Sequence, residues 1–67
     1  MVIQLNNRTE DLPGNSKTIS EILEIKNFTF PRIIVKLNGK LVKKPFFGNT
    51  EVREGDELNV IHLISGG

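Results

Sequence analysis

The stretch RIIVKLNGKLV, residues 32–42, decides the fold of this chain. Two apolar runs rich in branched side chains flank Asn38-Gly39, and this dipeptide favours a two-residue hairpin turn because both residues accept positive φ angles. Residues 32–42 therefore predict two antiparallel strands. The neighbouring segments predict the elements that complete the sheet and cover it.

The segment before this hairpin carries the signals of a short helix. Thr18 followed three residues later by Glu21 forms a capping box, in which each side chain accepts a hydrogen bond from the other residue's backbone amide. The apolar residues at helical spacing are Ile19, Ile22 and Leu23. We expect a helix of about nine residues that ends near Asn27, because the residue before Pro31 avoids the helical region.

The remaining segments predict further strands and turns. In chain order we expect a strand at residues 2–5, a turn at 6–7, a returning strand at 8–12, a break at 13–15, an irregular segment at 43–52, a turn at 54–56 and a last strand at 57–64. We therefore predict an α+β fold of the β-grasp (ubiquitin-like) type, with a mixed sheet of four to five strands covered on one face by one short helix. The last strand is expected to lie centrally, beside the first, within a single domain of residues 1–67.

Length and composition limit the class of protein. The chain has 67 residues, which fit one domain. It has no cysteine, so neither a disulfide nor a thiolate metal site is expected, and its one histidine, His62, cannot build a metal site alone. No apolar run approaches the ~20 residues of a membrane span, and the start lacks the basic region of a signal peptide, so we expect a cytoplasmic protein with no membrane partner.

No set of side chains in the sequence predicts catalysis. The serines at 16, 20 and 65 have no base in their sequence context, and Gly39, Gly48 and Gly55 fall in separate turns rather than in a phosphate loop. We therefore expect a protein that is not an enzyme and that holds no permanently bound cofactor or metal. His62 is interpreted as a bystander in the last strand.

Charge is unevenly distributed although the net charge is only +1. The basic segment contains no acid between its members, which are Lys26, Arg32, Lys36, Lys40, Lys43 and Lys44. Such a segment either docks an acidic protein or nucleic acid, or keeps a strand face solvated; the second interpretation is favoured, and nucleic acid is not expected as a partner. For Phe46-Phe47, a role in and over the core is likewise favoured over base stacking.

The last strand carries more apolar side chains than one buried face needs. Leu58 and Val60 alternate onto one face, which we expect to be the core, whereas Ile61 and Leu63 should point to the other face. Exposed apolar residues beside a chain end indicate either a partner surface or a bulge with a second small cluster. Both interpretations stay open, and the candidate interface residues are Ile61, Leu63, Phe46 and Phe47.

From Val35 onward the chain resembles the ubiquitin-like sulfur carrier proteins, and above all the sulfur carriers of thiamine biosynthesis. The resemblance lies in VKLNGKLVKKPFF and VREGDELNVIHLISGG: the hairpin with Asn38, the Gly55-Asp56 turn, the apolar last strand and the closing Gly66-Gly67. In element order it covers the whole chain. One departure is KKPFFG, residues 43–48, where a more polar helical turn would be usual.

The resemblance implies a function for the tail, residues 64–67. It implies that an adenylating activating enzyme uses ATP on the carboxylate of Gly67 and that a sulfur donor such as a cysteine desulfurase converts this group to a thiocarboxylate. The sulfur would then pass to a thiazole synthase. Gly66, Ser65 and Ile64 would lead Gly67 into the partner, since glycine without a Cβ can thread a narrow channel. We expect this tail to be flexible in the carrier alone.

Three alternatives to this function remain. The first is the small subunit that carries sulfur for molybdopterin synthesis, whose chains also end in Gly-Gly. The second is a ubiquitin-like modifier that forms isopeptide bonds with lysines. The third, from a different class, is a β-grasp module for RNA binding or protein interaction, motivated by the segment from Lys36 to Lys44.

Overall fold

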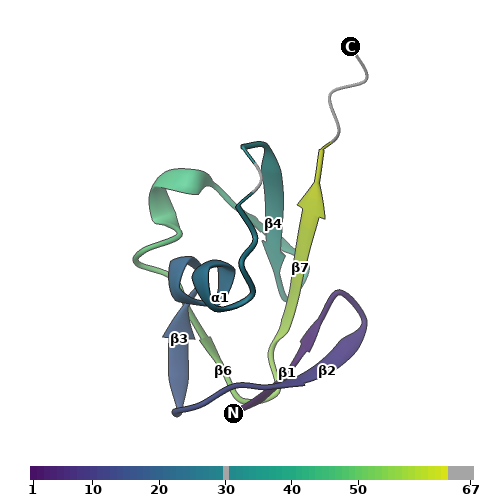
Figure 1. Cartoon of the computed structure of the whole chain (residues 1–67), viewed down its shortest axis with the longest axis vertical. Helices are drawn as coiled ribbons and strands as arrows, with labels where there is room; N and C mark the ends of the chain where they lie inside the picture. Colours follow the sequence, from purple (N-terminus) through teal and green to yellow (C-terminus); the bar gives the residue numbers. More distant parts are fainter. Residues whose placement is uncertain (30, 64–67) are drawn as a thin grey trace.

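A computed structural model describes residues 1–29 and 31–63 of the chain. Within these residues the chain forms a five-stranded sheet, a two-stranded sheet and one α-helix (Figure 1). The elements are β1 (Val2–Leu5), β2 (Arg8–Asp11), β3 (Ser16–Thr18), α1 (Ile19–Ile25), β4 (Ile33–Leu37), β5 (Lys40–Val42), the 3₁₀ turn η1 (Lys44–Phe46), β6 (Glu51–Arg53) and β7 (Glu57–His62). The order agrees with the predicted hairpin, helix, hairpin and last strand, with one additional pair of strands.

The larger sheet has the strand order β2-β1-β7-β4-β5. β7 lies at its centre, parallel to β1 with Leu5 opposite Leu58, and antiparallel to β4 with Val35 opposite Val60. Figure 1 shows α1 lying across one face of this sheet. The predicted β-grasp fold and the central position of the last strand are therefore confirmed.

Asparagines at the two hairpin turns also bond to β7. Asn6 and Asn38 have φ angles of 51°, as the predicted turns require. The Asn6 Oδ1 accepts a hydrogen bond of 2.8 Å from the Val60 amide, and the Asn38 Oδ1 accepts one of 2.9 Å from the Glu57 amide. Because β1 ends at Leu5, the Asn6 side chain continues the hydrogen-bond ladder along β7 after the backbone of β1 has turned away.

The helix begins where the capping box predicted. The Glu21 amide donates to the Thr18 hydroxyl at 3.1 Å, and the Glu21 carboxylate accepts from the Thr18 amide at 2.8 Å. The hydrogen bond from the Thr18 amide, and after it one from the Thr18 hydroxyl, lower the pKa of the Glu21 carboxyl. The helix is seven residues long and ends at Ile25. It stops through Asn27, whose φ of 59° lets the Phe28 amide bond back to the Leu23 carbonyl at 2.8 Å.

The prediction of an irregular segment at residues 43–52 is wrong at its end. Glu51–Arg53 forms β6, which pairs antiparallel with β3 and sets Lys17 opposite Val52. Strands of three residues show too little alternation to be recognised, and all three residues of β3 are polar. The same segment, where KKPFFG departs from the family pattern, nevertheless contains a helical turn, η1, which begins with Lys44-Pro45.

Two strand ends also differ from the predicted bounds. β2 stops at Asp11, one residue before the predicted end, and the Leu12 amide bonds instead to the Met1 carbonyl at 2.7 Å. β7 stops at His62, whereas the prediction ran to Ile64, which lies outside the described residues. Leu12 remains part of the core with 4% of its surface exposed.

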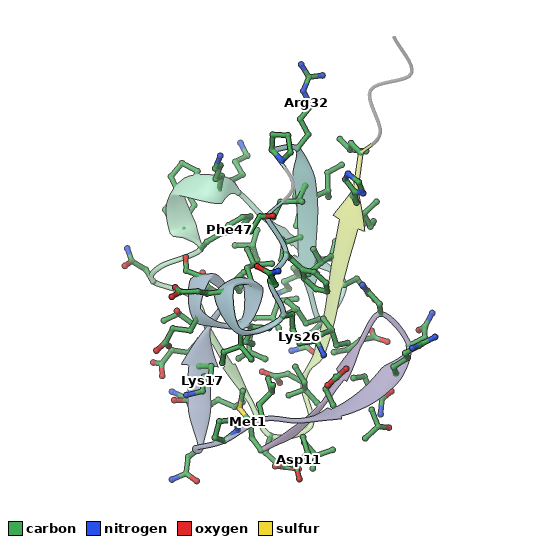
Figure 2. All side chains as sticks on the ribbon, viewed as in Figure 1. Met1, Asp11, Lys17, Lys26, Arg32 and Phe47 are labelled. Carbon is green, nitrogen blue, oxygen red and sulfur yellow. The ribbon has the colours of Figure 1, made fainter. Side chains whose placement is uncertain are left out.

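The core lies between the larger sheet and α1. Its buried members come from every layer of the fold: Ile3, Leu5, Leu12, Ile19, Ile22, Val35, Phe47, Val52, Leu58 and Val60. Leu58 and Val60 face this core, as their alternation predicted. Phe47 fills the side of the core under η1 (Figure 2), so one ring of the Phe46-Phe47 pair is inside, as predicted, while Phe46 remains 56% exposed.

Candidate functional site

The central strand carries the chain to the candidate site. β7 is hydrogen-bonded on both sides and ends at His62, and the Leu63 amide adds one more bond, 3.0 Å to the Arg32 carbonyl. The predicted reactive and threading residues lie beyond the described residues: Ile64, Ser65, Gly66 and Gly67. Residues 64–67 therefore follow directly on Leu63, a residue that is hydrogen-bonded beside the central strand.

The four candidate interface residues lie on three different surfaces. Ile61 is opposite Ile34 on the sheet face away from α1 and is 44% exposed. Phe46 shares a hollow at the edge of the sheet with Leu41, which is 59% exposed. Leu63 and Phe47 line a third surface, and Phe47, 6% exposed, offers only part of its ring there. Sequence spacing could not separate these surfaces, because they depend on where η1 and β5 pass.

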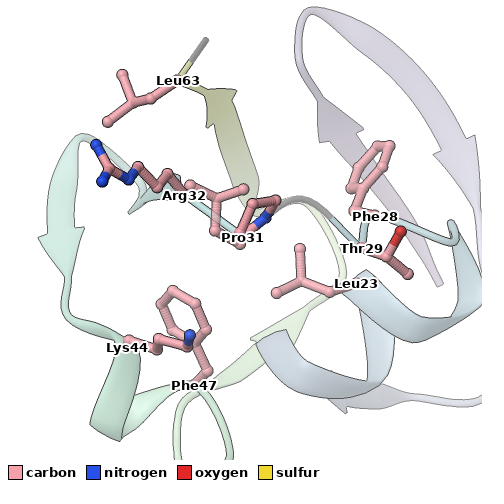
Figure 3. A pocket seen from close by; sticks show the side chains of 9 residues that line it. Leu23, Phe28, Thr29, Pro31, Arg32, Lys44, Phe47 and Leu63 are labelled. Atoms are coloured by element: carbon pink, nitrogen blue, oxygen red, sulfur yellow. The ribbon is translucent and has the colours of Figure 1, made fainter. Parts of the chain in front are cut away.

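The third surface is a groove beside the start of the tail (Figure 3). Its volume is about 540 Å³. Four segments form it: α1, the residues before β4 with its first residue, η1 with the residue after it, and Leu63 after β7. The apolar side chains lining it are Leu23, Phe28, Pro31, Ile33, Phe47 and Leu63. Two cations, Arg32 and Lys44, line the same groove from different elements (Figure 3).

The basic segment does not form one patch. Lys26 is held by Glu10 in an ion pair of 2.9 Å. Lys36 lies opposite Leu41 on the outer sheet face, and Lys40 lies beside the hairpin turn at the other end of the sheet. Arg32 and Lys44 remain at the groove, and neither makes an ion pair with another residue of the described ranges. A solvated face, as predicted, describes Lys36 and Lys40 but not the pair at the groove.

The described part of the chain contains no gathering of three or more His, Asp or Glu side chains suited to a metal ion. His62 is exposed and lies opposite Ile33 at the end of β7. No helix in residues 1–29 and 31–63 has the length and apolar character needed to cross a bilayer.

A β-grasp domain with its last described strand at the centre of the sheet has the architecture of the ubiquitin-like proteins. The model of the ThiS family matches residues 3–67, which is nearly the whole chain. The chain therefore belongs to the ThiS family, the sulfur carriers that the sequence resembles.

Two solved structures are similar to the chain. One is a crystal structure of the thiamine biosynthesis protein ThiS from Geobacter metallireducens, which shares 25% sequence identity with the chain at a TM-score of 0.88. The alignment covers 100% of both chains. An NMR solution structure of a thiamine biosynthesis protein from the same organism shares 24% identity at a TM-score of 0.76, over 100% of this chain and 88% of the other. No curated protein sequence matches the chain.

Proposed function

We propose that this chain is the sulfur carrier for thiazole formation in thiamine biosynthesis and that the α-carboxylate of Gly67 carries the sulfur. The observation that supports the proposal most directly is the family match, which extends through Gly66-Gly67 to residue 67. The similar crystal structure of a thiamine biosynthesis protein, over the full length of both chains, favours thiamine over the other pathways that use such carriers.

The chemistry needs only one group of the chain. In the activating enzyme, a carboxylate oxygen of Gly67 attacks the α-phosphorus of ATP and pyrophosphate leaves, which gives an acyl-adenylate. Hydrosulfide then attacks the acyl carbon and AMP leaves, which gives the thiocarboxylate without any change of oxidation state. A persulfide from a cysteine desulfurase would attack in the same way and give an acyl disulfide; a thiol would then attack the cysteine sulfur of that bond, forming a disulfide with it and releasing the thiocarboxylate. ATP is thus consumed by the partner and is not a resident cofactor of the carrier.

The tail suits this transfer because it is long enough to enter a partner, while the residue before it is hydrogen-bonded to the folded domain. Four extended residues, 64–67, reach about 13–14 Å beyond Leu63. Gly66 and Gly67 present no side chain that would clash in a narrow channel. The base of the tail, in contrast, is held by β7 and by the bond from the Leu63 amide to the Arg32 carbonyl. The carrier supplies a reacting atom within a limited reach of a folded domain, and its partners supply catalysis.

Intact-mass spectrometry tests the proposal. The chain is incubated with the purified activating enzyme, ATP and sulfide, and a product heavier by the difference between sulfur and oxygen is expected. A variant lacking Gly67 should fold normally and give no such product. If the activating enzyme is active on an authentic carrier but leaves this chain unchanged, the proposed function is wrong.

A second measurement separates the pathways. The thiocarboxylate form is mixed with thiazole synthase or with the large subunit of molybdopterin synthase, and loss of sulfur from the carrier is followed by mass. Consumption by thiazole synthase alone is expected. Consumption by the molybdopterin subunit alone would assign the chain to that pathway, and conjugates on a denaturing gel would assign it to the protein modifiers.

A further inference from the structure

We propose that the groove beside the tail is a docking site for an acidic segment with an apolar side chain, located on the activating enzyme that receives Gly67. The proposal rests on the proposed function and names the part of the partner that the carrier recognises. It also names the two residues that select an acidic segment, Arg32 and Lys44. Three independent features of the groove lead to this inference: its apolar lining, its charge and its position.

The lining of the groove is apolar and incompletely covered. Leu63 is 45% exposed, Pro31 is exposed, and Leu23 and Phe28 are half-buried. The volume of about 540 Å³ falls in the range, about 300–1,000 Å³, of pockets that hold small ligands. An apolar side chain inserted from a partner would be removed from water here, which favours binding.

The charge of the groove selects an acidic partner. Arg32 and Lys44 are exposed and line the opening, and no Asp or Glu belongs to the lining in the described ranges. Lys26 shows the contrast, because its ammonium already has a carboxylate partner in Glu10. A guanidinium next to an apolar surface pairs well with a carboxylate, since it is weakly hydrated and donates two parallel hydrogen bonds. The partner segment is therefore expected to carry Asp or Glu beside an apolar residue.

The position of the groove connects docking to chemistry. Leu63 lines the groove and is also the last residue before the tail. A partner seated in the groove would hold the base of the tail, so its nucleotide site must lie within about 13–14 Å of the docking contact. Holding the tail at this distance converts the encounter of Gly67 with ATP into an intramolecular step with a high effective concentration.

The groove residues are tested with charge reversal. Arg32→Glu, Lys44→Glu and the double variant are assayed with the purified activating enzyme and ATP, and pyrophosphate release is measured against carrier concentration. Lys40→Glu is the matched control for the single variants, and Lys36→Glu combined with Lys40→Glu is the control for the double variant, because each makes the same change of charge away from the groove. Circular dichroism verifies that each variant is folded, which is expected because all these side chains are exposed.

The double variant should raise the KM for the carrier about tenfold, leave kcat at saturation unchanged, and reduce the dependence of kcat/KM on salt. The control double variant, Lys36→Glu with Lys40→Glu, should leave KM within about twofold of the original chain. An equal rise in this control would mean that only net charge matters, and an unchanged KM in Arg32→Glu with Lys44→Glu would mean that the groove is not used. A fall in kcat at constant KM would assign Arg32 and Lys44 to the chemical step. Each of these three results overturns the docking site.

The other occupants of the groove give different results. If a second copy occupied it, the original chain would sediment as a dimer and the double variant as a monomer. If the chain's own tail occupied it, the double variant would lose Gly67 faster to carboxypeptidase and would show a lower KM. Either result overturns the proposal. Product from every variant with equal KM would leave the proposed function intact, whereas no product from the original chain would refute both.

Discussion

The two ends of the larger sheet differ in whether their polar groups are hydrogen-bonded to other parts of the chain. At the end where β7 begins, backbone and side-chain groups bond to each other across three segments of the chain. The Asp56 carboxylate accepts from the Arg53 amide at 2.8 Å and from the Asn38 side chain at 3.2 Å. The Glu54 carboxylate accepts from the Val2 amide at 2.8 Å. At the end where β7 finishes, Arg32 and Lys44 line an apolar groove without such partners in the described ranges.

The contrast indicates that, in this small domain, one end contributes mainly to stability and the other is available for recognition. A chain of 67 residues has an expected free energy of unfolding of only about 3–10 kcal/mol, so few residues can be left unsatisfied. In the described residues, polar groups at the end where β7 begins bond to each other, whereas the end where β7 finishes exposes apolar and cationic side chains. We call these the closed end and the open end, respectively.

The largest expected difference between the ends is in the loss of stability when a leucine is replaced by alanine. Leu58 is fully buried near the closed end, whereas Leu63 is 45% exposed at the open end. Leu58→Ala should lower the free energy of unfolding by about 2–5 kcal/mol, because it leaves a cavity in the core. Leu63→Ala should lower it by about 1 kcal/mol or less and should instead raise the KM for activation. Urea unfolding measures both, and equal losses would contradict the contrast.

Asn6 tests whether a turn side chain stabilises the central strand. Asn6→Ala should cost about 1–3 kcal/mol, because the part-buried Val60 amide loses its acceptor and alanine disfavours a φ of 51°. Asn6→Gly should cost about 1 kcal/mol less, since it removes only the acceptor. Hydrogen exchange at the Val60 amide should accelerate in both variants. Protection retained in Asn6→Gly would show that the side-chain bond is dispensable.

The cap of α1 should have a smaller effect. Thr18→Ala removes the hydroxyl that accepts from the Glu21 amide and should lower stability by about 1 kcal/mol. Thr18→Ser keeps the acceptor and serves as the control, with most of the stability retained. Thermal unfolding of the three proteins provides the comparison. A Ser variant as unstable as the Ala variant would point to the methyl group rather than the cap.

The smallest expected effect is the pH dependence of the same cap. The pKa of the Glu21 carboxyl is lowered in the folded chain, chiefly by the Thr18 amide. A lowered pKa means that the unfolded state binds the proton first, so this contribution is present at neutral pH and is lost as the pH falls through the lowered value. Melting curves of the original chain and of Glu21→Gln should therefore converge at acid pH. Curves that stay parallel would exclude the carboxylate as the cause.

Local signals in the sequence predicted most of the fold. Asn38-Gly39, the Thr18 and Glu21 pair and the apolar runs each act over a few residues, so their structures could be derived without knowing the rest. The central position of the last strand followed from analogy to the β-grasp fold, and the structure confirms it. The strands β3 and β6 could not be predicted, because each has three residues and depends on the other for its pairing.

The candidate site was only partly accessible to sequence reasoning. Resemblance to the family identified the tail, residues 64–67, and the list of apolar interface residues included Leu63 and Phe47. The groove itself combines residues 23, 28–29, 31–33, 44, 47 and 63, which no spacing rule connects. Arg32 and Lys44 were visible as members of a basic segment, but their separation from Lys36 and Lys40 depends on the reversal of direction at Asn38-Gly39.

The central place of β7 has a mechanical consequence. A partner that pulls on Leu63 along the strand loads the ladders to β1 and β4 in shear, so that their hydrogen bonds resist together rather than opening one after another as at a peeled edge strand. Tension applied at Leu63 would therefore be shared between the two halves of the sheet, because β7 is bonded to β1 on one side and to β4 on the other.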